Sequence, residues 1–447
     1  MYISQPSSLP TKPKTNWGSI IQLILSALAA CTLLGFAAIT VISTAVNYFI
    51  QDPEATDPTM SFMVAGSLAF AGILTLPSAW YAWKHLSHPE IEPAPRKESR
   101  NFVPILTVVV LVLVTGALLL GNWVSTNENL SWLILPLLNI VATGLPAAWL
   151  VYVGTRGLIP GRPSRWWGVF SSGLVFTPVI ILVVELFVLI AVGILAIIWV
   201  MFDPSLSNQL TSLASRIQDA GSNPEALLQI ILPFLLNPGV LVLVFAFISV
   251  IVPVIEEALK PLGLWFLAGQ RITPAQGFGY GVLCGAGFGL FENLGNTSMG
   301  GETWAILTAT RASTLLLHCL NSGLVGWGLA SVWTHRRYLR LAATFLYAVT
   351  IHGLWNGLAV LSLMGSLEGE TSISIPASLV QAGSYAPIGI VALAAFNLVF
   401  YLGFNSTMRK SLPSTPSVPA GNTPSSPQTI PPLSPQMDEN YPPETNP

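Results

Sequence analysis

Apolar runs long enough to cross a lipid bilayer dominate this chain of 447 residues, and ten of them can be distinguished. A transmembrane helix needs roughly 20 apolar residues, and a composition of 52% hydrophobic and 9% charged residues is far from that of a soluble protein. Backbone groups in lipid must be hydrogen-bonded within the protein, so we expect an all-α polytopic membrane protein with about ten transmembrane helices. The runs lie near 18–49, 61–83, 103–121, 130–153, 168–201, 239–268, 275–297, 304–333, 341–364 and 385–404.

Basic residues are distributed unequally between the two sets of segments that flank these runs. Fifteen of the 18 Lys and Arg residues fall on one side, together with both ends of the chain, and Arg216 is the clear exception on the other. Acidic residues predominate on that second side. Because short cytoplasmic loops retain Lys and Arg, both termini are predicted to be cytoplasmic.

Composition and motif content divide the chain into three parts. We expect residues 1–235 to form an N-terminal transmembrane scaffold, residues 236–408 to carry the chemistry, and residues 409–447, rich in Pro, Ser and Thr, to be a disordered cytoplasmic tail. Apolar side chains at helical spacing also predict an amphipathic helix on the membrane surface near 206–220.

A short sequence is repeated within the first part. Leu76-Pro-Ser-Ala-Trp80 reappears as Leu145-Pro-Ala-Ala-Trp149, which is 69 residues later. Residues 18–153 are therefore either a duplicated helical hairpin or two hairpins whose aromatic residues simply lie at the membrane interface. Neither copy holds a His or a membrane-embedded acid.

Two adjacent acids lie in the apolar run 239–268 and are followed by a lysine. Charged groups at membrane depth persist mainly where they pair, line a wet cavity or do chemistry. Lys260 comes four residues after Glu256 and three after Glu257, so it reaches both carboxylates on one helix face. A cation near two crowded acids favours different protonation states for them, as a general acid/base pair requires. Snorkelling at a helix end would explain Lys260 but not both glutamates.

The next run combines a glycine stripe with a polar end. Glycine occupies every fourth position from Gly277 to Gly289, a register that allows close helix packing. Glu292 continues this stripe and is followed by Asn293, so its carboxylate is predicted to point into a helix interface. The stripe itself indicates packing, whereas the acid at its end indicates a site.

Two histidines follow in the next two runs. Arg311 and His318 are seven residues apart on one predicted helix face, with Asn321 one turn beyond. His352 is followed at four residues by Asn356. One buried imidazole is often structural, but a second at membrane depth suggests that imidazoles and carboxylates converge on a catalytic centre.

Two chemistries suit these residues. His318, His352 and Glu292 are candidate ligands of zinc or another divalent metal with an open water position, although the local HExxH spacing is absent. Alternatively, Glu256 or Glu257 deprotonates water directly while His and Asn side chains stabilise the developing oxyanion. Both lead to hydrolysis within or beside the membrane.

These motifs together resemble those of the PrsW family of intramembrane proteases, over roughly 240–364. They are Glu256-Glu257-x-x-Lys260, Phe288-x-x-x-Glu292-Asn293, His318 and His352-x-x-x-Asn356. The resemblance implies a multi-pass protease of the bacterial cytoplasmic membrane, often classed as a metalloprotease, that cleaves membrane proteins such as anti-sigma factors. It also implies that Glu256 and Glu257 activate water, that Glu292 and the histidines complete the site, and that Lys260 orients the acids.

We therefore expect residues 236–408 to be a PrsW-like protease core that acts on membrane-protein substrates, contacts the lipid bilayer and binds no nucleic acid. Two other functions would use the same residues. They could form the relay of an ion- or proton-coupled transporter, although such sites are usually shared between repeats. They could also belong to a non-catalytic membrane scaffold.

Overall fold

The computed structural model describes residues 16–50, 57–88, 102–158, 163–221, 224–270, 272–366 and 375–411. These residues form helices joined by short turns, without a strand among them, which confirms the predicted all-α class. All of them belong to one compact unit, Met1–Ser411. Residues 412–447, which make up most of the tail predicted to be disordered, lie outside the described part of the chain.

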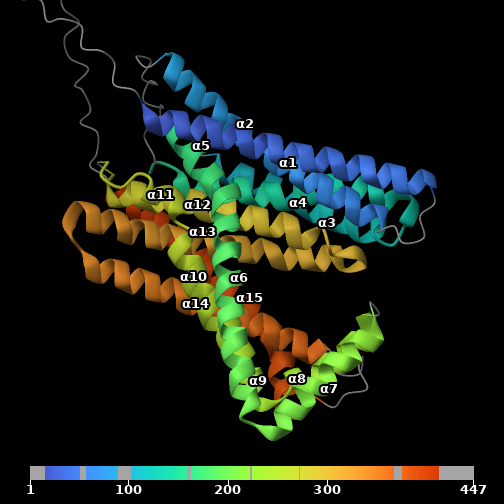
Figure 1. The fold of residues 1–447 in the computed structure, drawn as a ribbon. Coiled ribbons are helices and arrows are strands. Elements are labelled where there is room, and N and C mark those ends of the chain that lie inside the picture. Colours follow the sequence, from blue (N-terminus) through green and yellow to red (C-terminus); the bar gives the residue numbers. More distant parts are fainter. Residues whose placement is uncertain are drawn as a thin grey trace, which may run out of the picture. The chain divides into compact units, whose positions relative to one another are not determined.

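Nine segments of the described chain are long and apolar enough to cross a membrane (Figure 1). They are α1 (Trp17–Ile50), α2 (Pro58–Ser87), α3 (Val103–Val124), α4 (Glu128–Thr155), the segment Pro163–Met201, the segment Pro238–Trp265, α13 (Trp304–His335), α14 (Tyr338–Ser366) and α15 (Ala377–Lys410). The two composite segments are interrupted by π-helices. The first consists of α5 (Pro163–Ser171), η1 (Ser172–Phe176) and α6 (Thr177–Met201), and the second of α9 (Pro238–Ala246), η2 (Phe247–Ile251), α10 (Val252–Leu259) and α11 (Leu262–Trp265).

The tenth predicted span is the glycine-rich helix α12 (Pro274–Thr297), which is not among the nine strongly apolar segments. Most of its residues are buried within the protein. A helix enclosed by other helices needs no lipid-facing apolar surface, so glycine can replace larger side chains. The difference between ten predicted spans and nine apolar segments thus reflects one helix that lies inside the bundle.

Between α6 and α9, two shorter helices follow each other. α7 (Pro204–Ala220) covers the segment for which the sequence predicts an amphipathic helix, and Leu206 is its one buried residue in the described chain. Asp203 caps its first turn by accepting hydrogen bonds from the Ser205 and Leu206 backbone N–H groups, and hydrogen bonds from the same two residues lower the pKa of Asp203. α8 (Pro224–Leu235) packs against α7.

The backbones of α12 and α13 are in direct contact along the glycine stripe, and Figure 1 shows the two helices side by side. A Cβ atom at Gly281 would collide with the carbonyl oxygen of Ser322, and one at Gly285 with the carbonyl oxygen of His318. The stripe therefore sets how close α13 lies to α12. This spacing also fixes His318 beside the end of α12.

Substitution of one glycine in this stripe should destabilise the protein. We expect Gly281→Ala to lower the free energy of unfolding by about 1–3 kcal/mol, as overpacking of an interior does. Gly295→Ala, in the same helix, is the matched control because no atom lies within 4 Å of its Cβ position. Thermal unfolding in detergent measures both. Equal melting temperatures for the two variants would contradict the close helix contact.

Buried hydrogen bonds connect the N-terminal helices to the second half of the chain. Asn139 in α4 accepts a bond from Trp304 Nε1 at 3.1 Å and donates to Ser67 in α2 at 3.2 Å. The Ser67 hydroxyl is also 2.9 Å from that of Ser298, just after α12. Polar contacts of this kind help to hold membrane helices together, because burying apolar side chains against another helix gains little over leaving them in lipid. The first four helices thus pack as part of the same bundle.

The orientation of the chain remains a prediction from its basic residues. Single-cysteine labelling of intact cells tests it at positions near Asp57, at the start of α2, and Glu128, at the start of α4. Both positions should react only with reagent added from outside. If both positions react only from the cytoplasm, the predicted orientation is wrong. If they react from opposite sides of the membrane, the predicted number of spans is wrong.

Candidate active site

The helix α10, which carries Glu256 and Glu257, is directly preceded by the π-helix η2. In the π-helix η2 hydrogen bonds run five residues back, and the backbone N–H of Val252 donates to the carbonyl of Phe247. The next donor in this register would belong to Pro253, which has no N–H. The carbonyl of Ile248, about two helical turns before the acids, is therefore left without a helical partner.

Asn356 supplies the missing hydrogen bond from α14. Its Nδ2 donates to the carbonyl of Ile248 at 3.0 Å. Gly353 permits this approach, because a Cβ there would collide with the carbonyl oxygen of Ser249. The spacing His352-x-x-x-Asn356 is thus explained by geometry: the glycine brings α14 against η2, the asparagine fixes the turn, and His352 lies beside the acids.

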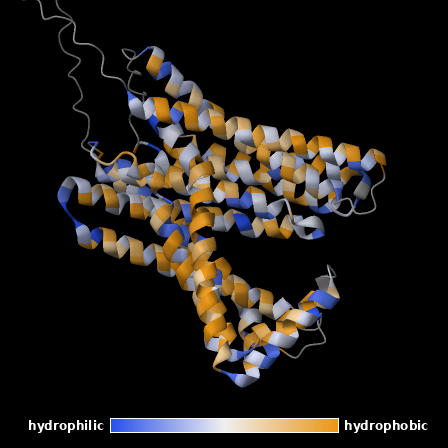
Figure 2. Ribbon diagram, in the orientation of Figure 1, coloured by the Kyte–Doolittle hydropathy of each residue, from blue (hydrophilic) through white to orange (hydrophobic). Residues whose placement is uncertain are grey.

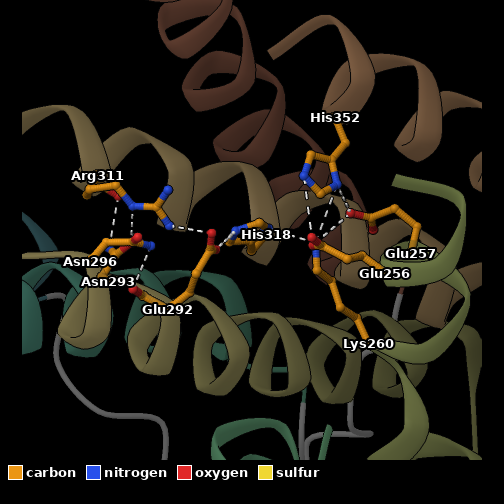
Figure 3. Close-up of polar contacts among 9 residues, drawn as sticks. All are labelled: Glu256, Glu257, Lys260, Glu292, Asn293, Asn296, Arg311, His318 and His352. Carbon is orange, nitrogen blue, oxygen red and sulfur yellow. Dashed lines mark hydrogen bonds and ion pairs between the residues drawn. The ribbon is translucent and has the colours of Figure 1, made fainter. Parts of the chain in front are cut away.

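The ammonium group of Lys260 is at the centre of the site (Figure 3). Its Nζ lies 2.8 Å from Glu256 Oε2, 2.8 Å from Glu257 Oε1, 2.8 Å from His318 Nδ1 and 3.5 Å from His352 Nδ1. Lys260 and Glu257 are fully buried, and the two histidines nearly so. Side chains of three helices, α10, α13 and α14, therefore surround one positive charge.

Each histidine also contacts a carboxylate through a ring nitrogen. His318 Nε2 is 2.7 Å from Glu292 Oε2, and His352 Nδ1 is 2.9 Å from Glu257 Oε1. The second ring nitrogen of His318, Nδ1, lies against Lys260 Nζ, and the second ring nitrogen of His352, Nε2, lies 3.8 Å from Glu256 Oε2. Carboxylate partners of this kind fix the tautomer and the orientation of a metal-binding imidazole.

A second group of polar contacts holds Glu292 in place. Arg311 Nη2 is 2.8 Å from Glu292 Oε1, and Arg311 Nε donates to Asn293 Oδ1 at 3.0 Å. Asn293 Nδ2 in turn donates to the carbonyl of Arg311 at 2.9 Å. Figure 3 shows these residues continuing from His318 away from Lys260. The sequence spacing predicts Arg311 on the helix face of His318 but does not indicate that Glu292 is its partner.

Phe288, the first residue of its motif, contacts both cation and imidazole. Lys260 Nζ is 4.7 Å from the centre of its ring, and the His318 ring packs edge-on against it with centroids 5.2 Å apart. A cation over an aromatic face is stabilised by the ring quadrupole. The aromatic ring therefore helps to stabilise the buried ammonium.

Glu256, His318 and His352 form a group that could hold a metal ion. All three are buried, and one ligand atom from each lies within 4.8 Å of the others. A carboxylate with two imidazoles is a donor set found in catalytic zinc sites. Glu257 Oε2 is also buried and lacks a hydrogen-bond partner in the described chain. The donor set fits a divalent metal, with Glu256 in the position for which the sequence suggested Glu292.

Every predicted site residue lies in this region. Glu256, Glu257, Lys260, Glu292, His318 and His352 form one connected set of contacts, whereas Asn293 and Asn356 bond to backbone or to Arg311 around it. Glu185, which lies in α6 and interacts electrostatically with Glu256, Lys260 and Glu292, is not among the predicted site residues. The signal for it in the sequence is that it is the one acid in the apolar run 168–201.

Comparison with known proteins identifies the family. Residues 166–383 match the PrsW family of intramembrane metalloproteases. The matched segment, slightly less than half of the chain, is similar to the PrsW family. The match extends from α5 into α15 and includes all the site residues. No curated protein and no solved structure matches the chain. The protein is therefore a multi-pass intramembrane protease of a metalloprotease family.

Proposed function

We propose that this PrsW family protease hydrolyses peptide bonds of other membrane proteins at the site formed by Glu256, Glu257, His318 and His352, with Glu292 completing it. The observation that carries the proposal is the convergence of carboxylate and imidazole groups from α10, α13 and α14 on one buried point. Such groups are costly at membrane depth and mark functional sites there.

Glu256, His318 and His352 would hold the metal in this proposal. A divalent metal supplies Lewis-acid chemistry, which polarises a peptide carbonyl and makes water a better nucleophile. Glu257 orients the ring of His352 through its Oε1, and Glu292 does the same for His318. Arg311 and Asn293 keep the Glu292 carboxylate in that position.

Glu257 is the general base in this arrangement. Its Oε1 is engaged by Lys260 and His352, but its Oε2 is buried and without a hydrogen-bond partner in the described chain. A water proton transferred to this oxygen can pass to the leaving amine, as a single glutamate does in many hydrolases. Lys260 tunes the acids and transfers no proton.

Replacement of Lys260 by methionine tests this division of roles. We expect Lys260→Met to reduce cleavage less than Glu257→Gln does, because the base and the candidate ligands remain. The yield of monodisperse protein should also fall. The two buried carboxylates lose their cationic partner, which lies 2.8 Å from each of them. Cleavage per folded molecule, measured after size-exclusion chromatography, separates the two effects. A rate as low as that of Glu257→Gln would make Lys260 a catalytic residue.

The family resemblance supports a proposal for the substrate class and the location. We propose that the protein acts in the bacterial cytoplasmic membrane on regulators such as anti-sigma factors. A comparison of membrane proteomes tests this, using cells with the parent protein, with Glu257→Gln and with Glu302→Gln, an exposed control. Fragments of membrane proteins should appear with the parent and the control alone. Identical fragment sets in all three strains would contradict proteolysis at this site.

A further inference from the structure

Glu185 is an acid that the proposed mechanism does not use. It is the one ionisable residue of α6, whose membrane segment contains an 18-residue stretch with a mean hydropathy of 3.2, of which only 6% is buried inside the protein. Its neighbours Leu186 and Phe187 are exposed. Figure 2 shows the ribbon of α6 in the hydrophobic colour along nearly its whole length. A carboxyl group in such a helix is costly and calls for a specific reason.

The position of α6 relative to the active site gives part of that reason. α6 packs against α10, which carries Glu256 and is followed directly by Lys260, and against α12, which carries Glu292. Glu185 interacts electrostatically with all three of these residues. Its carboxyl group is therefore on the inner side of α6, while the leucine and phenylalanine next to it face outward. α6 therefore lies directly beside the helices of the active site.

The other acids of the site each have a cationic partner. Glu256 and Glu257 pair with Lys260, and Glu292 pairs with Arg311. Glu185 forms no ion pair with any residue that the structure describes, and its Oε1 is buried without a hydrogen-bond partner. A buried acceptor without a donor is expensive to keep. A donor brought by another molecule would satisfy it.

A membrane segment undergoing cleavage provides such donors. A peptide bond inside a helix has its N–H and C=O groups engaged, so the segment must unwind locally before it can be hydrolysed. Unwinding leaves main-chain N–H groups unpaired in a medium that cannot hydrate them. A carboxylate is the strongest side-chain acceptor for these groups.

We propose that Glu185 is a substrate-binding residue of this protease, and that its carboxylate accepts hydrogen bonds from main-chain N–H groups of the unwound membrane segment. This inference rests on the proposed function for its class of substrate. It assigns to α6 the side of the site at which the substrate backbone is held. Glu185 should therefore bind a membrane segment whose helix is interrupted more tightly than one whose helix is continuous, because a continuous helix has no free N–H groups in its interior.

Binding of two synthetic peptides tests the proposal. Each peptide has about 20 apolar residues; one carries a central Gly-Pro pair that interrupts the helix, and the other carries Ala-Leu there. Binding is measured by fluorescence anisotropy in detergent, with the full-length Glu257→Gln variant, which does not cleave the peptides. This variant should bind the interrupted peptide more tightly than the continuous one. Adding Glu185→Leu should weaken binding of that peptide by about tenfold to a hundredfold and leave the continuous peptide unaffected.

Two further variants complete the experiment. Glu185→Gln keeps a carbonyl acceptor and should lose less affinity, whereas Leu186→Ala is the control on the outward face of the same turn. Unchanged binding by Glu185→Leu, equal loss for both peptides, or no preference in the starting protein would each overturn the proposal. Cleavage is assayed separately in protein that keeps Glu257, so absence of proteolysis would refute the proposed function without altering the binding result.

Discussion

Glutamine in place of Glu257 should reduce substrate cleavage by about a hundredfold to ten-thousandfold, the range typical for loss of a general base. Glutamine has the volume of glutamate, and its carbonyl oxygen can still accept from Lys260, whose Nζ lies 2.8 Å from Glu257 Oε1. It cannot accept a proton from water. The variant should therefore insert and remain monodisperse, and cleavage of a co-expressed membrane substrate should fall to background.

Glu256→Gln should lose cleavage to a similar extent for a different reason. In the proposed site Glu256 is a metal ligand, so this variant should also lose bound metal, whereas Glu257→Gln should keep it. Glu302→Gln is the exposed control for both. Cleavage at the parental rate by both site variants would refute a catalytic role for the pair. Misfolding of both would instead assign the acids to the structure of the bundle.

Removal of both histidines should release the metal. We expect parent protein purified in mild detergent to carry close to one transition-metal ion per chain, and the double variant His318→Ala with His352→Ala to carry almost none. The physical reason is that Glu256 alone would remain of the three grouped donors. Elemental analysis of monodisperse protein measures the metal directly and does not depend on activity.

Glu292→Gln makes this experiment more specific. The carboxylate of Glu292 touches His318 Nε2 and would orient the ring without being one of the three ligands. Loss of such a partner typically weakens metal affinity about tenfold to a hundredfold. A complete loss of metal in Glu292→Gln would identify it as a ligand. Full activity in metal-free protein would exclude the metal-dependent mechanism and favour the one in which a glutamate activates water without a metal.

The sequence predicted much of this site because its signals are local. Charged and imidazole groups in apolar runs are conspicuous, so Glu256, Lys260, Glu292, His318 and His352 could all be identified before any helix was positioned. The glycine register of α12 was equally visible, because close helix contact needs small residues at a fixed spacing. The span count differed only at α12, where burial inside protein removes the need for strong hydropathy.

Other features depend on how helices cross, which spacing alone does not determine. Pro253 is visible in the sequence, but its effect on Ile248 and the compensating bond from Asn356 require that α14 touch η2. The pairing of Arg311 with Glu292 likewise depends on the contact of α12 with α13. Glu185 is one acid in an apolar run, and only the packing of α6 on α10 gives it significance.

The central position of Lys260 has a consequence for how the protein is made. A chain delivered helix by helix into the bilayer must neutralise Glu256 and Glu257 before any metal is acquired, and its own ammonium, 2.8 Å from each, does so. Insertion and metal loading can therefore be separate events, because the lysine compensates the charge of both carboxylates while no ion is bound. Newly synthesised protein in chelator-treated membranes should accordingly be fully inserted, protected from protease and ready to bind metal afterwards.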